Sequence, residues 1–576
     1  MPSTALTMRT RLRALEAMAA PEGVDVLVVG GGITGAGIAL DAATRGLNTA
    51  IVEAQDWGDG TSSRSSKLVH GGLRYLQMLD FKLVREALTE RDLLLSTLAP
   101  HLVQPIPFLY PITHPVWERP YVATGVGMYD VLAHAPGRKR ALPIQKHLSR
   151  KALIEAFPDI RPDAAVGAVR YYDAKVDDAR LVLTVVRTAV LHGALAAART
   201  QVVGMVKSAH GIVEGADIVD LIDGTHYRVK AKNVICATGA WTEQTEALVS
   251  PDSGLRVLAS KGVHIVVPNE RIHGTMGLIL QTEKSVLFII PWDKYWIIGT
   301  TDTPWHETLT HPVATSRDID YVIEHANKVL RRPLTRKDVI GCFAGLRPLL
   351  QPGTKAGTSS ARISREHTVA SPAPGMTVIA GGKLTTYRVM AKDAVDFALG
   401  AQAATLPSIT HCVPLLGAEG FEATLAARAD LARRYGWPLR RVKHLLTRYG
   451  SLVGELTDLI DADPKLGQPV PGAPDYLRCE IVYAAAHEGA LTLSDVMMTR
   501  TRLNYEQADC GLGAAGAIAD LLAPILGWDE GRQEAEIAAY TDRVRAEKAA
   551  RETLTDAEAE EVRLTAADPT PMLAFA

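Results

Sequence analysis

A glycine-rich stretch near the amino terminus has the residue types and spacing of a phosphate-binding loop. It has the pattern GxGxxG and directly follows a strand-like run, VDVLVV, that begins at Val24. The first glycine permits a tight turn, the second lets a pyrophosphate approach the backbone, and the third lets helix and strand pack closely. The amides at the start of the following helix favour an anion. We expect a dinucleotide to contact Gly30, Gly32, Ile33, Thr34 and Gly35.

An acidic residue, Glu53, ends the next strand-like run, about 20 residues downstream as this motif requires. A carboxylate at this position accepts hydrogen bonds from a ribose and disfavours a 2′-phosphate, which argues against NADP. The glycine motif by itself does not separate FAD from NAD. A glycine turn that serves only backbone geometry is the alternative.

A second polar segment, TSSRSSK at 61–67, comes soon after Glu53 and is followed by HGGLRY at 70–75. NAD needs no such loop, whereas a larger cofactor with ribityl and flavin ends does. A solvated surface loop would explain the serines but not a Gly-Gly-Leu-Arg run among apolar residues. We therefore expect FAD, with further contacts from Thr61, Ser62, Ser66, Lys67, Leu68, Gly71 and Gly72.

The elements that would position these residues form a β-α-β unit, which requires a parallel sheet. Its helix is expected at 36–45 and its second strand at 49–53. Further helices are expected at 82–98 and 178–195, and the proline-rich stretch 100–120 is expected to be irregular or extended. Other strands are expected at 227–237, 263–267, 286–291, 296–299 and 378–380. After about residue 405, Ala-, Leu- and Arg-rich segments predict a helical region.

Composition bounds the class of protein. With 576 residues, 47% hydrophobic and 22% charged, the chain should form two or three globular domains. A net charge of -2 gives no basic field for nucleic acid. Five scattered cysteines predict neither a disulfide framework nor a zinc site, and we expect no metal and a reducing compartment. We expect no secretory signal, and no transmembrane helix because no apolar run is long enough for one.

Longer motifs give a family resemblance that covers roughly residues 24–400. VVGGGITGAGIALDAATRGLNTAIVEAQD and TSSRSSKLVHGGLRYL resemble the FAD-dependent glycerol-3-phosphate dehydrogenases and the related glycerophosphate oxidases. The likeness continues, in the same order, through VDDARLVL, NVICATGAW, KGVHIVVP, IIPWDKYWIIGTTDTP, GLRPL, ISREHTV and GGKLTTYR. It implies an α/β fold with a glutathione-reductase-like, FAD-binding Rossmann domain, a β-sheet substrate domain and an α-helical C-terminal domain. It also implies oxidation of sn-glycerol 3-phosphate to dihydroxyacetone phosphate, with electrons passed to a membrane quinone.

The implied substrate is a phosphate dianion that carries a secondary alcohol. Arginine binds phosphate through two parallel hydrogen bonds and stays charged. Arg74 and Arg365 are therefore expected to anchor the substrate, and Arg347 to lie nearest the alcohol. For any one of these arginines, a surface or interdomain ion pair is the alternative. Tyr75, Lys383 and Thr385 complete the expected substrate contacts.

His264 is our choice of general base, because neutral imidazole suits that role near pH 7. A core histidine with a structural role is the alternative, and His70 and His367 are weaker candidates. The loop GGKLTT at 381–386 should face the pyrimidine end of the flavin, where amides stabilise negative charge. The remaining expected cofactor contacts are Thr238, Gly239, Gly381, Gly382, Lys383, Leu384 and Thr385.

The motifs also suggest domain boundaries. We expect a leader at 1–23, a helical domain at 405–545 and a tail at 546–576 that frays from a helix into disorder. The FAD-binding domain would comprise 24–100, 165–260 and 340–400, and the substrate domain 101–164 and 261–339.

A quinone acceptor would place the protein in the cytoplasm, on the inner face of the membrane. The basic residues between Arg138 and Lys151, or those at 328–337, could contact anionic lipid, although a solvated face is the usual role of such runs. A homodimer is the oligomer that we keep open. One alternative function is a glycerophosphate oxidase, although the short interval between Leu349 and Ile363 leaves little room for that group's extra segment. Others are an amino-acid or amine oxidase and a flavoprotein without enzymatic activity.

Overall fold

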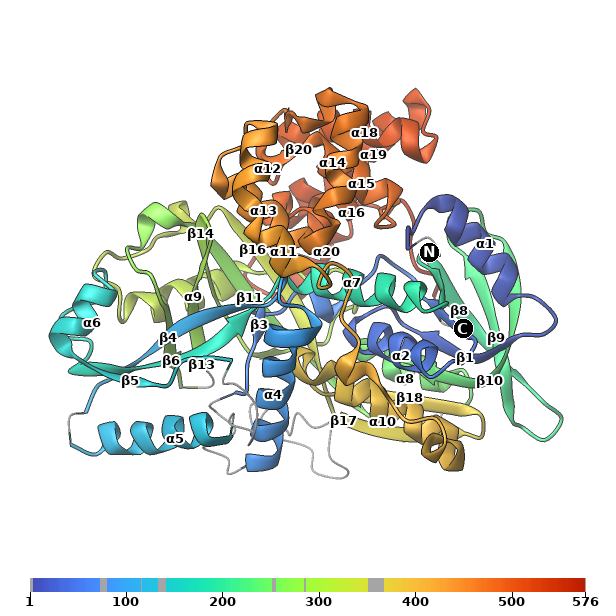
Figure 1. Cartoon of the computed structure of the whole chain (residues 1–576), viewed down its shortest axis with the longest axis horizontal. Helices are drawn as coiled ribbons and strands as arrows, with labels where there is room; N and C mark the ends of the chain where they lie inside the picture. Colours follow the sequence, from blue (N-terminus) through green and yellow to red (C-terminus); the bar gives the residue numbers. More distant parts are fainter. Residues whose placement is uncertain are drawn as a thin grey trace.

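A computed structural model describes residues 4–72, 80–114, 116–132, 141–250, 255–283, 286–350 and 367–574. Two sheets lie side by side, and a helical region covers their junction (Figure 1). This arrangement confirms the predicted fold class. Arg74, Tyr75 and Arg365 lie outside the described residues.

The first sheet contains the β-α-β unit. Its strands, in spatial order, are β17 (His367–Ala373), β18 (Met376–Gly381), β10 (His226–Cys236), β1 (Val24–Val29), β2 (Thr49–Val52) and β7 (Leu195–Ala197). All neighbours pair in parallel except β17 and β18, and β8 (Thr200–Lys207) and β9 (Val213–Asp220) extend β10 as an antiparallel ribbon. The sheet packs against α2 (Ile33–Thr44), α7 (Asp178–Leu191) and α10 (Tyr387–Leu399), with apolar side chains between them.

The second sheet is longer and mostly antiparallel. Its strands are β15 (Thr303–Pro304), β11 (Val257–Pro268), β14 (Tyr295–Gly299), β13 (Val286–Trp292), β12 (Gly277–Gln281), β4 (Gln104–Ile112), β6 (Gly167–Lys175) and β3 (Leu68–Val69), with β16 (Gly341–Leu350) beside β11 and β5 (Lys146–Ser149) beside β6. Strands β3, β6 and β16 belong to segments that we expected in the cofactor domain. Helices around this sheet are α4 (Phe81–Leu93), α5 (Glu118–Leu132), α6 (Arg150–Ala156) and α9 (Ser316–Asn327).

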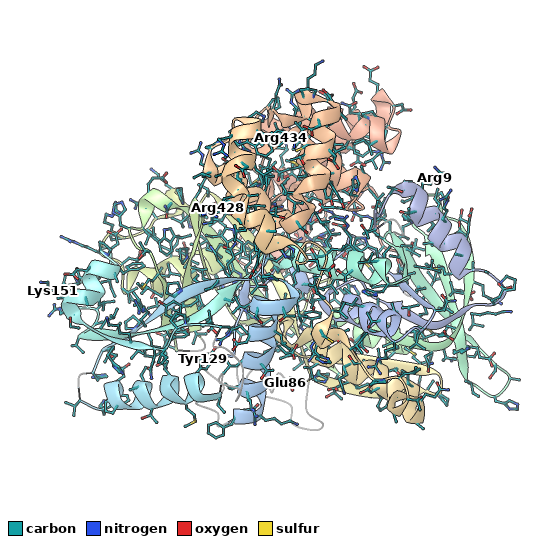
Figure 2. All side chains as sticks on the ribbon, viewed as in Figure 1. Arg9, Glu86, Tyr129, Lys151, Arg428 and Arg434 are labelled. Atoms are coloured by element: carbon teal, nitrogen blue, oxygen red, sulfur yellow. The ribbon has the colours of Figure 1, made fainter. Side chains whose placement is uncertain are left out.

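The helical region comprises α11 (Phe421–Ala426), α12 (Arg428–Tyr435), α13 (Leu439–Tyr449), α14 (Val453–Ala462), α15 (Arg478–Ala486), α16 (Leu493–Asp495), α17 (Leu503–Glu506), α18 (Leu512–Leu526), α19 (Glu530–Ala550) and α20 (Asp556–Arg563), with a small hairpin of β19 (Pro469–Val470) and β20 (Ala473–Leu477). Its outer surface presents charged side chains such as Arg434 (Figure 2). Its inner surface forms buried ion pairs with the first sheet's elements. No helix of the described ranges is both long enough and apolar enough to cross a bilayer.

The structure refines several local predictions, for identifiable reasons. Residues 100–120 were expected to be irregular or extended, and 104–112 form the extended strand β4, which pairs with β6 over its whole length but with β12 at two residues only. Its prolines, at 105, 107 and 111, all occupy odd positions, so their nitrogens face the same side of the strand. Because proline has no N–H to donate, that side is the one where the pairing is short. Helix α7 ends at Leu191 rather than 195, because Gly193 has a positive φ of 97° and the chain then enters β7.

The leader is helical, and the tail is more ordered than expected. The leader contains α1 (Met8–Met18), and the guanidinium of its buried Arg11 pairs with the carboxylate of Asp220 at 2.6 Å. The tail does not fray into disorder over its described residues, 546–574. After α20 it returns to the first sheet, where the Leu573 amide donates to Gln201 Oε1 at 2.7 Å and Gln201 Nε2 donates to the Leu573 carbonyl at 2.9 Å. The N and C marks lie on the same side of the molecule (Figure 1).

Candidate active site

One cavity, of about 320 Å³, lies at the carboxyl ends of the parallel strands. This is where ligands bind in open α/β sheets. Strands β11 and β16 of the second sheet contribute residues to the opposite wall. The cavity therefore lies between the two sheets.

The glycine loop forms the floor of the cavity. Gly30 has a φ of +105°, and a Cβ there would lie 2.7 Å from the Ala237 carbonyl oxygen, so only glycine fits. Gly32 is the N-cap of α2, and the Ile33 amide donates to Ser62 Oγ at 2.9 Å. Gly35 faces the Gly30 carbonyl and lets α2 pack against β1, outside the cavity lining. The helix N-terminus at Gly32 thus offers backbone amides to an anion.

The Glu53 carboxylate lies beside this loop. It accepts hydrogen bonds from the amides of Gly31, at 2.5 Å, and Gln55, at 2.7 Å. Burial raises the pKa of the Glu53 carboxyl to about 7, against the opposite effect of these amides. Its position at the end of β2 is the one expected for a group that binds ribose hydroxyls.

The segment 61–68 crosses between the sheets. Thr61 Oγ1 donates to the Leu346 carbonyl at 2.6 Å, which links the segment to β16. Thr61, Ser62, Ser66 and Leu68 line the cavity. Lys67 does not line it: its ammonium is buried 2.5 Å from the Asp178 carboxylate. A charged side chain in this motif suggested cofactor contact, but the buried carboxylate at the start of α7 binds it instead.

His264 and Arg347 reach the cavity from neighbouring antiparallel strands. On β11, Gly262 and His264 line the cavity and Val263 does not, as the two-residue period of a strand requires. On β16 the lining runs through residues 345–349, and Gly262 pairs with Gly345. A Cβ on Gly262 would overlap the Arg347 guanidinium, so that glycine leaves room for the arginine.

His264 is buried and its ring stacks on Phe343, with 4.8 Å between centroids. Nε2 lies 2.8 Å from Ser66 Oγ, while Nδ1 has no hydrogen-bond partner among the described residues. Burial, together with the Arg347 and Lys67 cations, lowers the pKa of His264 well below its ordinary value. The imidazole is therefore neutral at physiological pH, as a general base must be.

Arg347 is held by its neighbours on the loop after β14. Nη2 donates to Thr300 Oγ1 at 2.9 Å and to the Thr301 carbonyl at 3.1 Å, and Nη1 lies 3.3 Å from Asp302 Oδ1. Ser260 donates to the same Asp302 oxygen. These contacts fix one side of the guanidinium, and its side chain lines the cavity.

The loop between β18 and α10 borders the same space. Gly381 and Gly382 have positive φ values of 80° and 86°, and both line the cavity with Lys383, Leu384 and Thr385. The His70 amide donates to Thr385 Oγ1 at 3.2 Å. This contact connects the loop to the end of β3.

The remaining candidates lie partly in the cavity and partly outside it. Thr238, Gly239 and His70 line the cavity, whereas Gly71, Gly72 and His367 do not. The Gly71 amide donates to the Tyr129 hydroxyl at 2.8 Å, and Tyr129, on α5, points toward the second sheet (Figure 2). His367 pairs with Asp393 at 3.0 Å.

Some lining residues were not predicted. Arg64 is in the TSSRSSK motif, so its type and place were a usable signal. Thr200, Gln201 and Met572 also line the cavity. No sequence signal indicated them, because no pattern predicts that the tail lies beside the start of β8. A second groove, of about 630 Å³, adjoins the cavity, and its lining includes Trp241, Leu258, Trp305, Leu349, Met572 and Leu573. Among the described residues, no group of three His, Cys, Asp or Glu side chains could hold a metal ion.

Comparisons with known proteins agree with this geometry. Residues 25–388 match the FAD dependent oxidoreductase model, and 408–533 match the C-terminal domain of alpha-glycerophosphate oxidase. The chain is 47% identical to a Mycobacterium leprae glycerol-3-phosphate dehydrogenase, over 98% of this chain and 95% of that one. It is 37% identical to a Bos taurus mitochondrial glycerol-3-phosphate dehydrogenase, over 89% and 72% of the two chains.

Solved structures give the same picture of the fold. A Bacillus halodurans glycerol-3-phosphate dehydrogenase complexed with FAD matches with a TM-score of 0.75 at 28% identity, over 94% of this chain and 98% of that one. A Mycoplasma pneumoniae L-alpha-glycerophosphate oxidase with FAD bound matches with a TM-score of 0.51 at 17% identity, over 65% and 94%. The second likeness supports the shared fold only.

Proposed function

We propose a function from the premise that this chain belongs to the FAD-dependent glycerol-3-phosphate dehydrogenase family. The proposed reaction oxidises sn-glycerol 3-phosphate to dihydroxyacetone phosphate and passes the electrons to a membrane quinone. The observation that carries the proposal is the pair His264 and Arg347, which places a neutral base and a fixed cation in one wall of the cofactor cavity.

FAD is the cofactor of this family, and the residues present fit it. Gly30 and Gly32 have no side chains that would block a pyrophosphate, and the N-terminus of α2 supplies amides. Glu53 would accept the ribose hydroxyls, and the backbone at 381–385 would face the flavin. When bound, FAD supplies the two-electron acceptor for the hydride that leaves carbon 2 of the substrate.

The chain's own residues would bind the substrate and take its proton. Arg347 would lie nearest the alcohol and Lys383 would contact the substrate, while Arg74, Tyr75 and Arg365 are proposed to anchor it on the strength of their motifs. The alcohol proton would pass to Nε2 of His264, with Ser66 beside it. Loss of one hydride and one proton converts the secondary alcohol to the ketone.

A membrane acceptor requires a docking face, and one edge of the second sheet offers apolar side chains. Val116, Trp117 and Ile144 are 82%, 61% and 59% exposed, and the first two precede α5. Lys146 and Lys151 lie nearby in the chain and are exposed, with Lys151 at the outer end of the molecule (Figure 2). We place the bilayer contact on this edge, on the cytoplasmic side of the membrane.

The second basic run is less suited to lipid. Lys328, Arg332 and Arg336 form salt bridges with Glu283, Asp159 and Asp320. Their charges are therefore partly offset within the protein, which leaves less net attraction for an anionic surface.

The acceptor is tested with FAD-loaded protein and sn-glycerol 3-phosphate. We would compare turnover under argon with a soluble quinone analogue against turnover in air without quinone, and measure peroxide in both. Fast quinone reduction with slow peroxide release supports the dehydrogenase. Peroxide formed as fast as substrate is consumed would instead identify an oxidase. If no turnover occurs with either quinone or oxygen, while dithionite still reduces the flavin, the proposed substrate is refuted.

A further inference from the structure

One short segment of the helical region touches the outer side of the cofactor cavity. It consists of α16 and the single π-helical turn η12 (Val496–Arg500), which closes with a bond from the Thr501 amide to the Val496 carbonyl at 2.8 Å. Asp495, Thr499 and Arg500 are all buried on its inner side. None of them lines the cavity.

Arg500 and Thr499 hold the loop that follows Glu53. Arg500 makes a two-pronged ion pair with Asp56, with Nη1 2.5 Å from Oδ2 and Nη2 2.8 Å from Oδ1. Thr499 Oγ1 donates to the same carboxylate at 2.7 Å. Asp56 points away from the cavity, while its neighbours Glu53, Gln55, Gly58, Asp59 and Gly60 line it.

Asp495 holds the adjoining wall. Its Oδ1 lies 2.6 Å from Nη2 of Arg199, which precedes the cavity-lining residues 200–202. Asp495 is itself fixed, because its Oδ2 accepts from the amides of Leu491 and Thr492 at 2.9 and 3.0 Å. The two walls are joined by bonds from the Arg199 amide to the Gln55 carbonyl, at 3.1 Å, and from the Thr200 amide to the Glu53 carbonyl, at 2.7 Å.

We propose that Asp495, Thr499 and Arg500 are positioning residues that set the ribose end of the FAD site from outside it. Both walls depend on one rigid turn, so the loop after Glu53 keeps its shape only while the helical region is docked. FAD binding and docking of that region should then strengthen each other by the same factor. The inference requires FAD as the cofactor but neither the substrate nor the acceptor proposed above.

The test measures FAD affinity in the full-length apoprotein by titration of flavin fluorescence. Arg500→Met should raise the Kd for FAD about tenfold or more, within the range of measured couplings between sites. Arg187→Met is the matched control. Arg187 is also buried and also reaches the helical region, with Nη1 2.9 Å from the Tyr483 hydroxyl, but it contacts no cavity-lining residue in the described structure.

A loss of folding must be kept apart from a loss of positioning. Removing one partner of a buried pair leaves the other charge unpaired, so the double variant Asp56→Asn/Arg500→Gln is measured as well. The proposal predicts weakened FAD binding in the double variant at a thermal stability no lower than that of Arg187→Met. It also predicts that FAD slows proteolytic cleavage within the helical region of the wild type but not of the double variant. Equal FAD affinities in the double variant, Arg187→Met and the wild type would overturn it.

Discussion

Nε2 of His264 lies 2.8 Å from Oγ of Ser66, and the histidine ring is stacked on Phe343 of the adjacent strand. The stacking and the strand pairing fix the ring plane, so the imidazole presents one nitrogen toward the cavity. Its lowered pKa keeps the ring neutral, with a proton on only one of its two nitrogens. This relationship underlies the proposed proton transfer.

Replacement of the base should slow chemistry without loss of the cofactor. We expect His264→Ala to lower the rate constant for flavin reduction by sn-glycerol 3-phosphate about 100-fold or more, as for other general bases. Stopped-flow absorbance measures this rate. The control is His325→Ala, which removes another buried histidine, paired with Glu283 on the far side of the second sheet. A change of less than threefold in His264→Ala would assign the base to another residue.

A glycine on the neighbouring strand should be needed to seat this histidine. A Cβ added to Gly299 would overlap the His264 ring, and that ring has no room to withdraw because Phe343 packs against it. We expect Gly299→Ala to lower both thermal stability and the rate of flavin reduction. Gly454→Ala, an exposed glycine in α14 with open space around it, should be neutral or stabilising. Equal behaviour of the two variants would contradict the assigned packing.

Asp302 should act through Arg347. The carboxylate lies between the guanidinium and Ser260 and does not line the cavity. We expect Asp302→Asn to reduce kcat/KM for sn-glycerol 3-phosphate about 10- to 100-fold, because a small misplacement of a binding group is costly. FAD affinity should not change. Asp320→Asn, which breaks the exposed pair with Arg336, should leave kcat/KM unaltered, so an equal loss in both variants would exclude the positioning role.

FAD affinity should rise with pH through neutrality. The carboxyl of Glu53 has a pKa of about 7 in the unliganded protein, chiefly because it is buried, with Asp59 and Asp56 adding to the effect. Ribose hydroxyls donate to the ionised form, so binding lowers this pKa and releases a proton. Between pH 6 and pH 8 the Kd should therefore fall about tenfold. In Glu53→Gln this dependence should disappear; a slope that persists there would trace it to another group.

The proposed docking edge should bind anionic lipid through its apolar side chains. We expect the double variant Val116→Ser/Trp117→Ser to lose at least half of its binding to vesicles of anionic and neutral phospholipid in a sedimentation assay. Leu439→Ser is the control, since Leu439 is 60% exposed but begins α13 in the helical region, away from α5 (Figure 1). Equal retention of binding by both variants would place the contact elsewhere.

The sequence was enough to place the residues whose positions depend on local backbone geometry. The glycine loop, Glu53 and the glycines at 381 and 382 lie at the ends of parallel strands, and a strand-loop-helix pattern is enough to place such residues. His264 and Arg347 needed more, because only the family motifs suggested that two strands far apart in the chain would bring them together.

What could not be predicted depends on contacts between distant segments. Lys67 was predicted to contact the cofactor, but its ammonium pairs with Asp178, which is more than a hundred residues away in the sequence. The return of the tail to Gln201 follows from two hydrogen bonds that leave no mark in composition. The same is true of Asp56 and Arg500, since neither residue indicates its partner by spacing or type.

The most direct test of the proposed activity is an anaerobic reduction of the bound flavin. We would mix FAD-loaded protein with sn-glycerol 3-phosphate, glycerol or inorganic phosphate under argon and follow the visible absorption of the flavin. The account predicts rapid and complete bleaching with sn-glycerol 3-phosphate alone, because both the phosphate-binding cations and the base are then engaged. An unchanged spectrum with sn-glycerol 3-phosphate, in protein whose flavin dithionite can reduce, would contradict the proposed substrate.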